Sequence, residues 1–204
     1  MFARSVTISG ADTSTIDQGI GYIRDDVMPE LRQIGCVGMS LVVDRDSGDL
    51  IATSSWETRA ARDASRELMA PYRAKAAEML EGQVSIADWE VALMHRDHAA
   101  FNLAACRITW AHTSDVDDLL ERYRTMVLPS ITEAMGFCSA SIFVDRERGA
   151  ICVNTTFDSR ATMVASRAWA DANRGRAQEV ADVVFTDVRE FDLVLAHLRV
   201  PELV

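Results

Sequence analysis

Histidine side chains are the groups in this sequence best suited to bind a metal or to transfer a proton near neutral pH. The chain has four of them, His95, His98, His112 and His197. His95 and His98 stand three residues apart, with Asp97 between them, where a strand is expected to give way to a linker. Zinc and iron sites need three or four convergent ligands. We therefore interpret the pair as polar linker residues and predict no metal site.

The four cysteines form no recognisable redox or zinc motif. The four are Cys36, Cys106, Cys138 and Cys152. They contain no Cys-x-x-Cys pair, and three of them lie in apolar, strand-like runs. Free cysteine packs as a small hydrophobic residue, and disulfides are rare in the cytosol. We predict reduced core cysteines, with a nucleophile or a ligand as the alternative.

Other motifs and the charge of the chain exclude several functional classes. The sequence has no Gly-x-Gly-x-x-Gly, Walker A or Gly-x-Ser-x-Gly pattern, which leaves nucleotide binding and hydrolase chemistry without support. A formal net charge of −10 disfavours both nucleic acid and an anionic membrane surface as partners. The apolar runs are too short to span a bilayer, and the first residues lack the apolar stretch of a signal peptide. We expect a cytoplasmic globular protein.

The sequence contains two copies of one unit. Residues 35–66 align with residues 136–167 at a constant offset of 101 without a gap, and 11 of these 32 pairs are identical. The offset is 100 upstream of this block and 102 near the end of the chain. Such collinear similarity indicates an internal repeat. We predict a first domain at 1–95, a linker at 96–104 and a second domain at 105–204.

Each copy has the pattern of a ferredoxin-like βαββαβ unit. Hydrophobic alternation, helical spacing and a charged hairpin ending in glycine predict strand, helix, strand, strand, helix and strand in that order. The predicted strands are 6–9, 36–44, 50–56 and 89–94 in the first copy, and 107–110, 137–145, 151–157 and 191–196 in the second; the predicted helices are 16–31, 58–80, 116–131 and 159–180. Pro29 and Pro129 should kink or restart the first helix of each copy.

Apolar residues occupy both faces of several predicted strands, which indicates that both faces of each sheet are covered. Helices cover one face, and the sheet of the other copy is the expected cover for the second. The predicted fold class is therefore α+β, with two tandem repeats forming a pseudo-dimeric α+β barrel. A monomeric pseudo-dimer and a homodimer both remain open.

A short motif connects this fold to a known family. Trp56-Glu57-Thr58, and in weaker form Phe157-Asp158-Ser159, stands between a strand and an Arg/Ala-rich helix. In this respect each copy resembles the antibiotic biosynthesis monooxygenase-like group of the dimeric α+β barrel superfamily. The resemblance implies an apolar pocket between sheet and helices in each copy. It also implies several activities, among them cofactor-free oxygenation of phenols and haem degradation.

The haem-degrading branch of that family does not match this sequence. It requires an axial histidine in the second helix and an asparagine on the first strand. The windows 58–80 and 159–180 contain no histidine, and the first strands offer no asparagine. We expect no haem, flavin, metal or other cofactor.

Cofactor-free oxygenation needs a base, an anion-stabilising donor and an apolar wall. Under the resemblance, His112 is the candidate base and Asn154 the candidate amide donor, with Trp56, Trp110 and Phe157 as candidate substrate-binding walls. The alternative interpretation treats the aromatic residues as core and His112 as an exposed loop residue.

The repeats differ at the positions predicted to line the pocket, which pair Trp56 with Phe157, Thr53 with Asn154 and Ser9 with Trp110. A fused pair can specialise one pocket and lose the other. We therefore predict a cofactor-independent oxidoreductase of the monooxygenase type that binds a small aromatic or polyketide-like molecule. The alternative is a non-catalytic protein that binds an apolar metabolite or serves in an assembly. Matched arginines in the helices, such as Arg66 and Arg167, indicate an inherited scaffold, with anion binding as the alternative.

Overall fold

The computed structural model describes residues 1–100, 103–198 and 201–203. In the first repeat the strands are β1 (Phe2–Ser9), β2 (Gly38–Asp44), β3 (Asp49–Trp56) and β4 (Gln83–Arg96), and the helices are α1 (Ile16–Tyr22), α2 (Met28–Gln33), α3 (Arg59–Leu68) and α4 (Ala70–Leu80). In the second repeat the strands are β5 (Ala105–Thr113), β6 (Phe137–Asp145), β7 (Ala150–Phe157) and β8 (Val183–Leu198), and the helices are α5 (Val116–Arg122), α6 (Leu128–Ile131), α7 (Arg160–Ala165) and α8 (Arg167–Val180).

The predicted α+β fold class is confirmed. Hydrogen-bonded strands follow one another in the order β1-β3-β2-β8-β5-β7-β6-β4 and close into a barrel within one chain. Each repeat has the βαββαβ order of a ferredoxin-like unit. None of the helices in the described ranges combines the length and the apolar character that crossing a bilayer requires.

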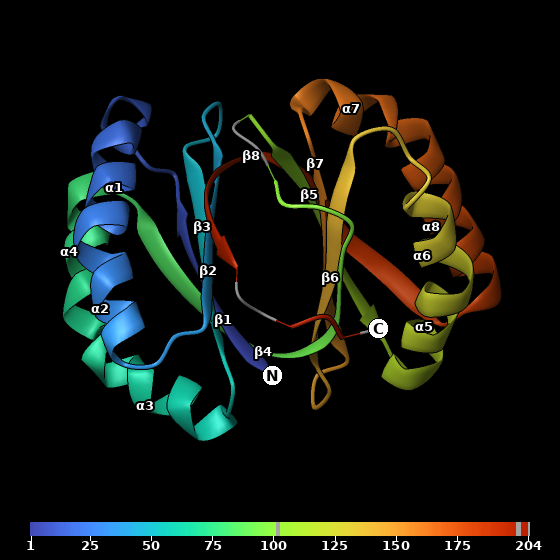
Figure 1. Cartoon of the computed structure of the whole chain (residues 1–204), viewed down its shortest axis with the longest axis horizontal. Helices are drawn as coiled ribbons and strands as arrows, with labels where there is room; N and C mark the ends of the chain where they lie inside the picture. Colours follow the sequence, from blue (N-terminus) through green and yellow to red (C-terminus); the bar gives the residue numbers. More distant parts are fainter. Residues whose placement is uncertain (101–102, 199–200, 204) are drawn as a thin grey trace. The chain divides into compact units, whose positions relative to one another are not determined.

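The chain divides into two compact units, which we describe separately. The N-terminal unit comprises Met1–Trp89 and Leu193–Val200, and the C-terminal unit comprises Glu90–Asp192 and Pro201–Val204. The divisions fall inside β4 and β8, so each of these long strands contributes to both units. In each unit the helices of the repeat cover one face of its own strands (Figure 1).

The final strand of each repeat is much longer than predicted. The sequence analysis placed these strands at 89–94 and 191–196, whereas β4 begins at Gln83 and β8 begins at Val183. The first residues of β4 are exposed, and they therefore lack the hydrophobic alternation that marks a strand. In β8, residues 183–192 pair with β5 along its whole length. Backbone pairing rather than side-chain burial extends both strands.

The predicted helices are interrupted at corresponding places. A π-helical segment, Ile23–Val27 in one repeat and Tyr123–Val127 in the other, precedes a helix with proline in its first turn. Proline lacks the amide hydrogen needed inside a helix, so the helix restarts there. The second helix of each repeat is also divided, because a non-helical residue separates α3 from α4 and α7 from α8.

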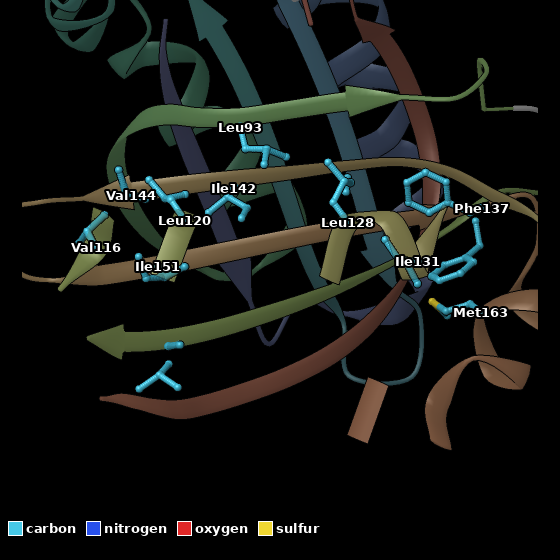
Figure 2. Packing of buried hydrophobic residues seen from close by; sticks show 14 of the residues in the cluster. Leu93, Val116, Leu120, Leu128, Ile131, Phe137, Ile142, Val144, Ile151 and Met163 are labelled. Atoms are coloured by element: carbon cyan, nitrogen blue, oxygen red, sulfur yellow. The ribbon is translucent and has the colours of Figure 1, made fainter. Parts of the chain in front are cut away.

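Side chains from the helices and the sheet form one core in each unit. In the C-terminal unit, Leu120, Leu128 and Ile131 from the helices pack against Ile142 and Ile151 from the strands (Figure 2). The corresponding core of the N-terminal unit is built around Ile16, Leu41, Leu50, Trp56 and Leu80. Thr58 and Ser159 cap the helices that follow β3 and β7 by accepting backbone hydrogen bonds. The Trp56-Glu57-Thr58 motif and its weaker counterpart therefore serve as helix starts.

Candidate functional site

The C-terminal unit contains a cavity of about 150 Å³ between its sheet and its helices. Its wall on the sheet side includes Thr109 from β5 and Val153 and Thr155 from β7. Helical residues close the other side, among them Tyr123 and Trp169. Cavities of about this size, when lined by apolar groups, accept a single benzene-sized ring. The space therefore suits a small aromatic molecule.

Three hydroxyl groups interrupt the mainly apolar wall of this cavity. They belong to Thr109, Tyr123 and Thr155. Burial raises the pKa of Tyr123 above its ordinary value, although a hydrogen bond with Thr155 acts in the opposite direction. The phenol is therefore protonated at neutral pH, and it can donate or accept a hydrogen bond. These groups can orient a ligand that carries one polar substituent.

The N-terminal unit contains a smaller cavity of about 60 Å³ at the equivalent place. Strand register fixes which residues correspond, because Arg4 pairs with Ser54 in one repeat as Arg107 pairs with Thr155 in the other. By this register and the repeat alignment, several positions hold a larger side chain in the first repeat and a smaller one in the second. The corresponding pairs on the two cavity walls are Ile8 with Ala111, Met69 with Ala170, and Tyr72 with Asn173.

The polar groups on the two walls differ as well. Val6 and Ile23 occupy the positions of Thr109 and Tyr123, and only the third hydroxyl has a counterpart, in Ser54. The smaller cavity has further hydroxyl groups of its own, on Thr53, Ser65 and Tyr72. The second repeat is therefore distinguished by its larger space and by the positions of its hydroxyl groups.

A buried arginine lies at the wall of the larger cavity and uses all its nitrogen atoms. Arg107 donates from Nε and Nη2 to Glu190, from Nη1 to Ser166 Oγ and from Nη2 to the carbonyl of Met163. Arg167 also bonds with Glu190. Hydrogen bonds from Arg167 and Arg107 lower the pKa of the Glu190 carboxyl to about 2. Arg107 is therefore committed to the scaffold and is not available to a ligand.

The same cluster exists in the first repeat. Arg4 donates to Asp88, to Ser65 Oγ at 2.8 Å and to the carbonyl of Arg62 at 2.9 Å, and Arg66 bonds with Asp88. Hydrogen bonds from Arg4 and Arg66 lower the pKa of Asp88, although its burial acts in the opposite direction. The predicted role of Arg66 and Arg167 as inherited scaffold agrees with these contacts.

His112 and Asn154 lie away from the cavity. The cavity wall includes Thr109 and Ala111 from β5, and successive strand residues face opposite sides of the sheet. His112 therefore faces the side without helices, where it is exposed. Asn154 has the same orientation relative to Val153 and Thr155, and its buried Nδ2 has no hydrogen-bond partner among the residues that the structure describes. Their proposed catalytic roles remain predictions.

The three aromatic candidates do not converge either. Trp110 is half-buried on the same face of the sheet as His112. Phe157 is fully buried in the core of the C-terminal unit, beside Phe137. Trp56 is fully buried in the other unit, where its indole donates to Ser54 Oγ. The predicted alignment of Ser9 with Trp110 is wrong. Thr7 lies opposite Ile51 in the first repeat as Trp110 lies opposite Cys152 in the second, so Thr7 is the counterpart of Trp110. The first strands are offset by 103 residues, a value that the sequence comparison did not detect.

A second cluster in the C-terminal unit brings together donors that a metal ion could use. Nε2 of His98, Sγ of Cys138 and a carboxylate oxygen of Asp158 lie within 4.8 Å of one another. His95, in contrast, bonds with Glu202 at 2.6 Å. Burial, together with the hydrogen bond to Asp158, raises the pKa of the Cys138 thiol to about 12. The hydrogen bond to Asp158 raises the pKa of His98. All four cysteines are free thiols, as predicted.

None of the residues predicted to form the site lines the larger cavity. The signal of the lining residues was present in the repeat, because the offset of 101 pairs Met69 with Ala170 and Tyr72 with Asn173. A search for catalytic residue types favours polar side chains, whereas the feature that distinguishes the two cavities is a loss of side-chain volume.

Curated relatives cover the whole chain. No family model matches the sequence. "Uncharacterized protein Rv2557" of Mycobacterium tuberculosis is 46% identical over 207 residues, which span 100% of this chain and 92% of that protein. "Uncharacterized protein Rv2558" of the same organism is 46% identical over 210 residues, which span 100% of this chain and 88% of that protein.

Solved structures share the fold at low sequence identity. A candidate monooxygenase from Fusobacterium nucleatum subsp. nucleatum superposes with a TM-score of 0.67 at 10% identity, covering 97% of this chain and 94% of that one. An anthrone oxidase-like protein gives 0.64 at 11% identity, covering 96% and 92%. A ferredoxin-fold protein of Listeria monocytogenes, related to antibiotic biosynthesis monooxygenases, gives 0.53 at 10% identity, covering 94% of each chain.

Proposed function

The chain belongs to the family of the Mycobacterium tuberculosis proteins Rv2557 and Rv2558 and has the antibiotic biosynthesis monooxygenase-like fold of the dimeric α+β barrel superfamily, and from this we propose that it binds a small aromatic molecule in the cavity of its C-terminal unit. The observation that carries the proposal is the difference between the two cavities. The second repeat encloses about 150 Å³ and the first about 60 Å³.

The chemistry of the wall defines the class of ligand. Apolar side chains such as Val153 and Trp169 suit a flat ring, whose burial is favourable by roughly 25 cal/mol per Å² of apolar surface. The hydroxyls of Thr109, Tyr123 and Thr155 suit one phenolic or carbonyl oxygen on that ring. We therefore propose a one-ring phenol or ketone as the ligand, without a bound metal or cofactor at this site.

Binding of p-cresol, measured by isothermal titration calorimetry, tests this proposal. Ala170→Met introduces into the cavity the residue that the first repeat has at this position, and we expect it to weaken binding at least tenfold. Met69→Leu is the matched control in the N-terminal unit, and we expect it to leave the affinity unchanged. Tyr123→Phe should weaken binding about threefold to tenfold if the phenol bonds with the ligand, since one such bond contributes about 0.5–1.5 kcal/mol.

The proposal fails if p-cresol does not bind the wild-type protein, or if it binds wild type and Ala170→Met equally. Circular dichroism and the melting temperature of each variant show whether it is folded. Ala177→Leu, which also fills the cavity, provides a second blocking variant on a different turn of α8.

Cofactor-free oxygenation of an aromatic substrate is a second candidate function. The likeness in fold to an anthrone oxidase-like protein favours it. In this proposal His112 removes the phenolic proton and Asn154 stabilises the anion. Because neither residue lines the cavity, this reaction requires a substrate on the other face of the sheet. Aerobic incubation with anthrone, followed by the absorbance of the quinone, tests it, and His112→Ala should abolish the product. Unchanged turnover in that variant contradicts the assignment of the base.

A further inference from the structure

Three potential ligand atoms converge where β6 begins and β7 ends. Asp158 Oδ1 lies 2.9 Å from His98 Nε2 and 3.2 Å from Cys138 Sγ. Cys138 is fully buried, while the side chains of His98 and Asp158 are 33% and 38% exposed. The cluster therefore has one buried sulfur and two ligands that an ion could reach from solvent.

The backbone holds these residues in place. The register between β6 and β7 shifts between Phe137 and Ser139, so Cys138 is the extra residue of a β-bulge. A bulge redirects a side chain out of the regular alternation of a strand, and bulges are frequent beside functional sites. The carbonyl of Cys138 accepts hydrogen bonds from the amides of Asp97 and His98, at 2.9 and 3.4 Å. The histidine segment is thus fastened to the residue that supplies the sulfur.

The remaining nitrogen of the histidine has the partner that a metal ligand requires. Asp97 Oδ2 lies 2.9 Å from Nδ1 of His98. A ligating histidine almost always bonds through its other nitrogen to a carboxylate or a carbonyl, which fixes the tautomer and the orientation of the ring. With Nδ1 bonded to Asp97, Nε2 can release its proton to solvent and present its lone pair to a metal ion.

We propose that His98 Nε2, Cys138 Sγ and the Asp158 carboxylate bind one zinc ion, with water completing a tetrahedral site. A thiolate, an imidazole and a carboxylate form a ligand set that zinc accepts. Tetrahedral zinc at ordinary bond lengths separates its ligands by roughly 3.3–3.6 Å, so the two contacts with Asp158 must lengthen by a few tenths of an ångström. On binding, the protons held by the thiol and between His98 and Asp158 pass to solvent.

The first repeat provides an internal comparison. By the same alignment, Val37 and Glu57 occupy the positions of Cys138 and Asp158. Valine supplies no ligand, so this position cannot form the same site in the N-terminal unit. The proposal therefore predicts one zinc ion per chain, and it is independent of the cavity and its ligand.

Cobalt(II) titration of protein dialysed against EDTA tests the site, because a thiolate bound to cobalt gives a charge-transfer band in the near ultraviolet. We expect one equivalent of cobalt to produce this band and one equivalent of zinc to remove it. Cys138→Val, which introduces the residue of the other repeat, should abolish the band. His98→Gln, Asp158→Asn and Asp97→Asn should each weaken zinc affinity by about tenfold or more. Cys36→Ser, which removes a different thiol, should leave both results unchanged.

The melting temperature separates a metal site from a purely structural hydrogen-bonded cluster. Zinc should raise the melting temperature of the wild-type protein and not that of Cys138→Val, since an ion that binds only the folded state stabilises it. If the variants melt at lower temperature but zinc has no effect on the wild type, the cluster is structural and the proposal is wrong. The same conclusion follows if cobalt gives no band, or gives an equal band in Cys138→Val.

Discussion

Each repeat has an equivalent buried ion-pair cluster, and the two repeats differ in the size of the cavity beside it. Arg4 with Asp88 in the N-terminal unit, and Arg107 with Glu190 in the C-terminal unit, hold the first strand, the second helix and the last strand together in the same way. The cavities next to these clusters measure about 60 and 150 Å³. The comparison indicates that duplication preserved this ion-pair cluster, while the wall residues of one copy were free to become smaller.

The strongest test of the shared ion-pair cluster is the stability of Glu190→Gln at acid pH. Removing one partner of a buried pair costs about 3–5 kcal/mol, so we expect the variant to lose about 4 kcal/mol of unfolding free energy at pH 7. The folded pKa of Glu190, about 2, lies below its ordinary value of 4.5. Its stabilisation is therefore present above pH 4.5 and is lost as the pH falls through 2. About 3 kcal/mol of the difference between wild type and variant should disappear between pH 5 and pH 2.

Urea denaturation followed by fluorescence at pH 7, 5, 3 and 2 measures how the difference in unfolding free energy between wild type and variant decreases. Asp88→Asn should behave in the same direction, because the pKa of Asp88 is also lowered in the folded protein. A pH-independent difference for both variants would show that the carboxylates act only through packing. A difference for one variant alone would show that the two clusters are not equivalent.

The sequence predicted the order of elements because that order depends on local patterns that both repeats share. The hairpins ending in Gly48 and Gly149 and the prolines that restart the first helices stand at corresponding positions. These signals fix the order of elements and the fold class.

The site could be predicted much less well. Arg4 and Arg107 occupy equivalent positions at an offset of 103, which appears only in the strand register. His98, Cys138 and Asp158 are separated by up to 60 residues, and a bulge brings them together. The cavity depends on which small residues face one another across sheet and helices. None of these relations leaves a continuous motif in the chain.

Met69→Ala tests whether side-chain volume alone explains the smaller cavity. Met69 is 5% exposed and lines this cavity, and its counterpart is Ala170. Truncating a buried methionine costs about 2–5 kcal/mol, and we expect about 3 kcal/mol in urea denaturation. If volume is the difference, the variant should bind p-cresol at a second site, which calorimetry records as a rise in stoichiometry. Met69→Leu should lose less than about 1.5 kcal/mol and gain no site. Loss of stability without new binding would instead assign the difference to the polar residues Thr109 and Tyr123.

Substitution of the hairpin glycines should have the smallest effect, and it tests whether the stability of the two repeats depends equally on their hairpins. Gly48 and Gly149 have φ angles of +76° and +63°, and an added Cβ would lie 2.2 Å from the carbonyl oxygen of Ala11 or Thr113. Those two residues also donate backbone hydrogen bonds to the glycines, so neither strand end can move away freely. We expect Gly48→Ala and Gly149→Ala to lose about 2 kcal/mol each. Gly10→Ala is the control, since Gly10 has a φ of +68° but nothing within 4 Å of the added carbon, and it should lose only about 1 kcal/mol. Equal losses at all three positions would assign the cost to backbone conformation alone. A larger loss at Gly149 than at Gly48 would show that the unit with the larger cavity depends more strongly on its hairpin.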